Sequence, residues 1–277
     1  MSKTLFDLTY ELARALGVLS EGIATGGDTD TILDSVERLE ANDFWNGGTA
    51  WITYDAGGLG AAPQGEYGFV SDFALSGGNI SLRTALTASV GAGDRYAIAG
   101  QRYPLQLLIQ KINETFGVIE KTDLTTVVIA GDQLLYSLPA DVLELKQVWV
   151  QPTTDSDRWE PIYDWSVQKS ATGSVNKLIF ERQFMAGLAV KLVYVGYHQV
   201  LRIATDKLDD SLHSKQIVYN AAVKCLLWYK SKVGDSDTSV NDLLNIYQPM
   251  AQAANTEHAQ RLPKKSAKTI HLVLNRP

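Results

Sequence analysis

The sequence has a single cysteine, Cys225, so no disulfide can form within one chain. Because thiols stay reduced in the cytosol, a lone cysteine favours folding in a reducing compartment. A zinc site built from several thiolates is excluded for the same reason, since those sites take two or more cysteines at CxxC-type spacing. At 277 residues, the chain is long enough to bury a core without disulfides or metals.

The sequence also lacks long apolar runs, and no run reaches the ~18 residues that a membrane span needs. The first residues, MSKTLFDLTYELARALG, have neither the basic start nor the apolar stretch of a signal peptide. Asp7, Glu11 and Arg14 interrupt them at helical spacing, which indicates an amphipathic helix. We therefore expect a soluble protein that is made in the cytoplasm and does not bind a membrane.

Motifs for catalysis and metal binding are equally scarce. The histidines do not pair at i+3 or i+4 and occur in no HExxH context. They are His198, His213, His258 and His271. There is no G-x-S-x-G nucleophile elbow, and Asp28, Asp30 and Asp34 lack the spacing and terminal glutamate of a calcium loop. We predict no catalytic residue, no cofactor and no metal site.

Two glycine loops superficially resemble phosphate cradles, at residues 57–60 (GGLG) and 91–94 (GAGD). Neither matches GxGxxG or GxxxxGK[ST]. The first leads into another expected strand, whereas a cradle needs a helix N-terminus aimed at the anion. We interpret both as turns.

Basic residues are few in the first hundred positions, where five Lys/Arg face thirteen Asp/Glu, for a net charge of 5 − 13 = −8. The remainder holds 25 − 5 = 20 basic and 31 − 13 = 18 acidic residues, for a net charge of +2. An acidic half does not attract phosphate backbones by bulk electrostatics. The asymmetry serves solubility, or it places the two halves in different surroundings.

The hydrophobic pattern predicts an α+β protein with a first domain at residues 1–100. A helix ending at Gly17 is followed by short alternating segments separated by glycine pairs, which is typical of an antiparallel β-barrel or sandwich. The expected strands are residues 31–39, 49–54, 66–73, 79–86 and 95–98. Aromatic residues gather there, among them Trp45 and Trp51, and they fit a core better than a carbohydrate platform.

Residues 101–262 are predicted to form a second domain with both a β-sheet and helices. A helix at 104–116 precedes strands at 125–129, 134–138, 143–150, 159–163, 177–182 and 189–195, with one helical turn at 164–169. Two long helices follow, 212–232 capped by Ser211 and 240–261 capped by Ser239, and their short connection predicts an antiparallel hairpin. Pro249 is expected to kink or break the second of them.

The last predicted part is an extended segment, residues 263–277. Ile270, Leu272 and Leu274 share one face of a short strand that is too small to fold alone and needs a sheet edge. The segment is basic because of Lys264, Lys265, Lys268 and Arg276. We predict that these seven residues bind a partner, and the alternative is that the segment packs on its own domain.

The order of segments across residues 101–262 resembles that of the head-to-tail adaptor proteins of tailed bacteriophages, including the tail tubular protein A class. The resemblance lies in YPLQLLIQKINETFG, in LYSLPADVLELKQVWV with Tyr136, Leu138 and Pro139, and in QIVYNAAVKCLLWY. NGGTAWITYDAGG, APQGEYGFVSDF and AGDRYAIAG also look like β-modules of phage virion proteins. The smallest adaptors lack a domain that corresponds to residues 1–100.

This resemblance implies a structural protein of the virion neck. Twelve copies would form a ring between the portal protein and the tail or nozzle protein, and DNA would pass through the ring without specific binding. The basic C-terminal segment would meet an acidic portal surface. Several alternatives stay open: a tail-tube, baseplate or capsid decoration protein, a carbohydrate- or receptor-binding protein that uses Trp45 and Trp51, and an enzyme with an unrecognised site.

Overall fold

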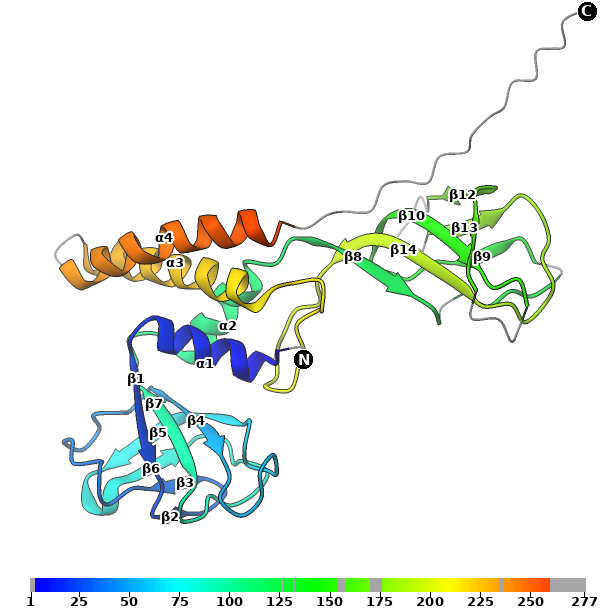
Figure 1. Cartoon of the computed structure of the whole chain (residues 1–277). Helices are drawn as coiled ribbons and strands as arrows, with labels where there is room; N and C mark the ends of the chain where they lie inside the picture. Colours follow the sequence, from blue (N-terminus) through cyan, green and yellow to red (C-terminus); the bar gives the residue numbers. More distant parts are fainter. Residues whose placement is uncertain are drawn as a thin grey trace, which may run out of the picture. The chain divides into compact units, whose positions relative to one another are not determined.

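The fold of the chain is α+β (Figure 1). The computed structural model describes residues 3–125, 127–131, 133–153, 158–169, 176–234 and 237–259, and within them lie four α-helices and three antiparallel sheets. The chain divides into two compact units. The first unit combines Met1–Phe116 with Gln199–Ala259, and the second is built on Gly117–His198. The predicted domain boundaries at residues 100 and 262 follow another division and stay a prediction.

Seven short strands of the first unit form one antiparallel sheet in the order β1-β7-β4-β5-β6-β3-β2. The strands are β1 (Leu19–Ile23), β2 (Gly26–Gly27), β3 (Thr31–Leu33), β4 (Thr49–Tyr54), β5 (Tyr67–Ala74), β6 (Asn79–Leu82) and β7 (Arg95–Ala99). A short 3₁₀ turn, η1 (Ser76–Gly78), precedes β6. The two edge strands, β1 and β2, are separated by only Ala24 and Thr25, a span of at most ~12 Å. The sheet therefore curls until its edges approach each other at this corner.

The inner face of the curled sheet holds its own hydrophobic core. Alternate residues of β4 and β7 point inward, among them Ile52, Tyr96 and Ile98, and they are almost fully buried. Val70, Phe73 and Ile80 close the core from β5 and β6. Residues of the other face, such as Trp51 and Ala99, are buried in the helical core, so both faces of β4 and β7 are covered.

The helices of the first unit build a separate core around the third helix. They are α1 (Leu5–Ala15), α2 (Leu105–Asn113), α3 (Ser214–Val233) and α4 (Thr238–Glu257). Leu8, Leu108 and Leu226 are fully buried in this core, and Trp51 enters it from the outer face of β4. The Trp51 indole N–H donates to the Thr9 hydroxyl at 3.1 Å, which ties the sheet to α1.

Local sequence accounts for both ends of α1. Thr4 and Asp7 form a capping box, in which each side chain accepts the other residue's backbone N–H. Gly17 follows the helix with a φ of 68°, a conformation that glycine adopts without a Cβ clash. The predicted end of this helix at Gly17 is confirmed.

The second unit contains two small antiparallel sheets. Their orders are β11-β10-β14-β8 and β12-β13-β9. The strands are β8 (Val118–Asp123), β9 (Leu135–Ser137), β10 (Val142–Val150), β11 (Glu160–Ile162), β12 (Trp165–Gln168), β13 (Lys177–Phe180) and β14 (Val190–Tyr197). Tyr136, Leu178 and Phe180 are buried in a core that both sheets share with residues of the connecting loops. The predicted pairing of residues 159–163 with the preceding strand is confirmed by β11, which pairs with β10.

Several predicted elements are wrong in type or length. Residues 164–169 were expected to form a helical turn, but Trp165–Gln168 is a strand that pairs with β13. The strand expected at 31–39 ends at Leu33, because the Asp34 carboxylate takes up the backbone N–H groups of Val36 and Glu37 and turns the chain. Around 125–129 the described residues contribute only one isolated bridge, between Val128 and Ala189.

The two long helices start at other residues than predicted. His213, not Ser211, is the N-cap of α3, and the Ser211 backbone N–H donates to Asp209 in the preceding turn. Asp237 caps α4 by accepting from Ser239, the residue that was expected to be the cap. Pro249 lies inside α4 without ending it, on an exposed part of the helix where water can satisfy the carbonyl that loses its partner. The predicted antiparallel hairpin is present, because α3 and α4 pack side by side.

We predict that the Cys225 thiol is unreactive in the folded protein. Its side chain is fully buried in α3, and burial raises the pKa of the thiol to about 12. A raised pKa means that almost no thiolate, the reactive form, exists at pH 8. Labelling with iodoacetamide at pH 8 should modify less than about a tenth of the native protein in the time that modifies all of it in 6 M guanidinium. Equal rates in the two conditions would contradict the buried position.

Candidate functional site

A buried polar cluster lies in the curled sheet of the first unit, and it includes Asp34, for which the sequence predicted no functional role. The Tyr96 hydroxyl donates to the Asp34 carboxylate at 2.6 Å and accepts from Arg38 Nε, also at 2.6 Å. All three side chains are buried. Burial, followed by the hydrogen bond to Asp34, raises the pKa of Tyr96, so its hydroxyl keeps the proton that it donates.

The Arg38 guanidinium joins the cluster to the edge strand β1. It donates to the Ser20 hydroxyl at 2.8 Å and to the Glu21 carbonyl at 2.7 Å. Its Cζ lies 5.5 Å from the centre of the Trp45 ring, within the range of a cation–π contact. A buried charge is tolerated when it is paired and hydrogen-bonded in this way. Arg38 therefore fixes residues 34–46, which we call the 34–46 loop, against β1.

Two glycines, Gly78 and Gly22, lie so close to the cluster that no side chain fits at either position. The Asp34 backbone N–H donates to the Gly78 carbonyl at 3.0 Å. Gly78 has a φ of 56°, and a Cβ at this position would lie 1.9 Å from the Asp34 carbonyl oxygen. A Cβ at Gly22 would lie 2.7 Å from the Tyr96 hydroxyl. Both glycines are thus required by the packing around the cluster.

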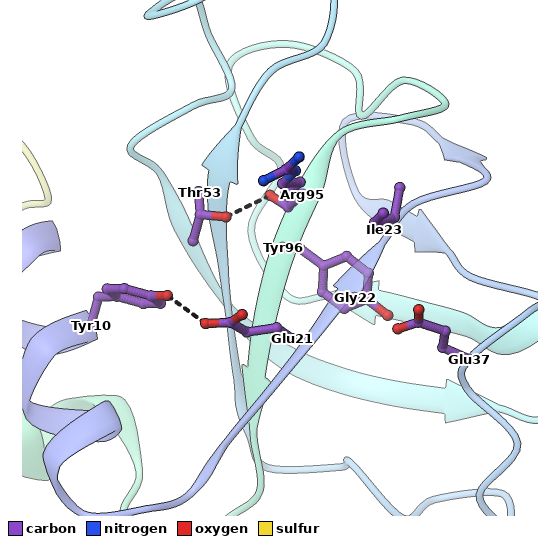
Figure 2. Close-up of a pocket in the computed structure, with 8 residues that line it drawn as sticks. All are labelled: Tyr10, Glu21, Gly22, Ile23, Glu37, Thr53, Arg95 and Tyr96. Atoms are coloured by element: carbon purple, nitrogen blue, oxygen red, sulfur yellow. Dashed lines mark hydrogen bonds between the residues drawn. The ribbon is translucent and has the colours of Figure 1, made fainter.

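An open pocket of about 370 Å³ lies beside the cluster, between α1 and the outer face of the sheet (Figure 2). It is lined by Tyr10, Glu21, Gly22, Ile23, Glu37, Thr53, Arg95 and Tyr96. The Tyr10 hydroxyl donates to Glu21 at 2.9 Å, and the Thr53 hydroxyl donates to the Arg95 carbonyl at 3.1 Å. The Tyr96 hydroxyl is engaged on both sides, so it is not available for proton transfer in this pocket.

Nearby side chains organise the two glycine loops: the Gly57 N–H donates to Asp55, the Gly60 N–H to Gln64 and the Gly91 N–H to Asp94. Asp94 is buried and accepts the backbone N–H groups of Ala56 at 2.8 Å and of Gly91 at 2.7 Å. Gly60 and Gly93 have φ values of 83° and 94°, as turn glycines do. Some of the backbone N–H groups that a phosphate would need are therefore already bound by Asp55, Gln64 and Asp94.

The tryptophans proposed for carbohydrate binding are not exposed. Trp51 is fully buried in the helical core, and Trp45 is buried beneath Arg38. A carbohydrate platform presents the faces of aromatic rings to solvent, which neither ring does. Phe44 and Tyr54 are the exposed aromatic residues of the same region.

The outer face of α4 carries an exposed apolar strip. Ile246, Pro249, Met250 and Ala253 recur at three- and four-residue steps on this face, and all are exposed. The adjoining face packs on α3 through Val240, Leu244, Ala251 and Ala254. The helix thus keeps an exposed apolar strip beside its buried face. We call these four residues the α4 strip.

The predicted partner-binding residues Lys264, Lys265, Lys268, Ile270, Leu272, Leu274 and Arg276 lie outside the described residues. A second prediction concerned metal binding. Within the described part of the chain, no group of three or more His, Cys, Asp or Glu side chains is arranged to hold a metal ion. One association that the sequence did not indicate is a stack of His213 on His258, with ring centres 3.7 Å apart, at the open end of the α3–α4 hairpin.

Comparison with protein-family models and with curated proteins finds no match for this chain. Among the helices that the structure describes, none is long and apolar enough to cross a membrane. The function of the chain is therefore inferred from its own surfaces, above all from the α4 strip and the 34–46 loop.

Proposed function

We propose that this protein is a structural component of a tailed-phage particle that forms a head-to-tail adaptor ring between the portal and the tail. The α4 strip is the observation that supports this most directly. A closed ring of identical subunits needs a heterologous contact, in which one surface meets a different surface of the next copy. The α4 strip covers residues 246–253 of this 20-residue helix, a length of ~12 Å, and suits one half of such a contact.

The layout of the first unit suits a scaffold for such contacts. The α4 helix is backed by α3, and α3 is in turn buried against α1 and α2. The strip is thus mounted on a packed core and does not need to fold on binding, which lowers the cost of association. In the proposed ring, DNA passes through the lumen without specific binding, and the C-terminal segment contacts the portal or a neighbouring copy.

The proposal is tested by cryo-electron microscopy of the assembled particle, or of the purified protein mixed with a candidate portal protein. We expect a ring of twelve copies at the neck, with α4 at the boundary between adjacent copies. Copies spread over the capsid faces would overturn the adaptor function in favour of a decoration protein. Three copies at a fibre tip would overturn it in favour of receptor binding.

A further inference from the structure

The 34–46 loop presents a second exposed apolar surface, far from α4 in the sequence. Val36 is 68% exposed, Leu39 71% and Phe44 58%. Leu75, 45% exposed, lies beside them, because its backbone N–H donates to the Asn42 side chain at 2.8 Å. We call these four residues the loop patch. Scattered apolar residues are ordinary on a protein surface, but here three lie within the nine residues 36–44 and a fourth is hydrogen-bonded to the same loop.

The loop patch is held on a rigid support. The loop has no regular secondary structure, yet the buried Asp34–Tyr96–Arg38 cluster fixes its start to β1 and β7. The Asp43 backbone N–H donates to the Phe73 carbonyl at 2.9 Å and fixes the loop's other end to β5. A loop that is ordered before binding loses little conformational entropy when a partner docks, so the exposed side chains are preorganised.

The border of the loop patch is acidic. Glu37 and Asp43 are exposed and lie between the apolar residues in the sequence, whereas Glu40 pairs with Arg38 at 3.5 Å, and Arg38, the sole basic residue of the 34–46 loop, is 2% exposed. A partner that fits this surface has apolar side chains bordered by lysine or arginine.

We infer that the loop patch binds residues 263–277 of a second copy of this chain. That segment has the complementary chemistry: Lys264, Lys265 and Lys268 precede alternating apolar residues, and it contains no Asp or Glu. Six residues in extended form, 269–274, span ~20 Å, enough to lay Ile270, Leu272 and Leu274 along an apolar surface. The inference deepens the proposed ring, since it gives the C-terminal segment a docking place on the neighbouring subunit.

The test is a titration of a fluorescent synthetic peptide of residues 263–277 with the full-length protein, followed by fluorescence anisotropy. We expect saturable binding that weakens with salt, because lysines meet carboxylates across the contact. Leu39→Lys should weaken binding at least tenfold by adding a like charge and removing apolar surface. Val36→Lys should act in the same direction, which guards against a folding defect in one variant.

Leu59→Lys is the matched control, because Leu59 is also highly exposed, at 81%, but lies in the 57–60 glycine loop. It should leave binding unchanged. A peptide with Ile270, Leu272 and Leu274 replaced by serine should bind at least tenfold more weakly than the natural peptide. Absence of peptide binding, or equal binding to the wild type and the Leu39→Lys variant, would overturn the inference.

The outcome is separable from that of the proposed function. A peptide that binds through Leu39 while the particle shows no ring would support the inference and overturn the adaptor function. A ring at the neck together with a peptide that binds an isolated portal protein but not this chain would support the adaptor function and overturn the inference.

Discussion

Replacing Asp34 with alanine is expected to lower the free energy of unfolding by about 3–5 kcal/mol, the usual cost of breaking a buried ion pair from one side. The change removes the acceptor of the Tyr96 hydroxyl and one of the two carboxylates beside the buried Arg38 guanidinium, the other being Glu40 at 3.5 Å. It also releases the Val36 and Glu37 backbone N–H groups that the other carboxylate oxygen accepts. Urea-induced unfolding, followed by tryptophan fluorescence and by circular dichroism, measures the loss.

Asp30→Ala is the control for this change, because Asp30 belongs to the same acidic stretch but is exposed. It should alter the free energy of unfolding by less than about 0.5 kcal/mol. Tyr96→Phe removes the hydroxyl alone and should fall between the two variants, at about 1–3 kcal/mol. If Asp34→Ala were as stable as Asp30→Ala, the buried cluster would not support the 34–46 loop.

Introducing aspartate at both Ile246 and Met250 is expected to abolish self-association of the protein while leaving its fold intact. Both side chains lie in the α4 strip and are exposed, so the free subunit loses little when they become charged. In a ring, however, the two carboxylates would be buried in an apolar contact between copies. Unpaired charges at the centre of an interface cost about 2 kcal/mol or more each, which is enough to dissociate most rings.

The matched control carries the same two charges on another side of the same helix, as Asn245→Asp together with Gln252→Asp. Both positions are exposed and lie off the α4 strip. Sedimentation velocity of the purified variants, with and without a portal protein, should show rings for the wild type and the control and subunits for Ile246→Asp/Met250→Asp. Rings formed by all three proteins would exclude the α4 strip from the contact between copies.

Regular elements with a strong local signal were predictable from the sequence. The Thr49–Tyr54 strand has the predicted bounds, because its side chains alternate between the core of the sheet and the core of the helices. The first helix and its end at Gly17 follow from a capping box and from a position with positive φ. Short strands with little apolar content, such as Gly26–Gly27 and Leu19–Ile23, carry no such signal and were missed.

Of the candidate sites, too, some were predictable from the sequence and others were not, but the reason differs from that for the helices and strands. The basic and apolar composition of residues 263–277 can be read directly, since it depends on the identity of each residue alone. The Asp34–Tyr96–Arg38 cluster could not be predicted, because Tyr96 is far along the chain from the other two. The same holds for the stack of His213 on His258, which only the pairing of α3 with α4 brings together.

By itself, the sequence determined the α+β class, the positions of most helices and strands, and the uneven distribution of charge. These properties depend on local periodicity and composition, which act over a few residues. The tertiary structure alone decided that Arg38 is buried and paired while Leu39, its neighbour, is exposed, and that α4 keeps an apolar strip on its outer face. Burial depends on which distant segments pack over a residue, and the residue itself does not encode that.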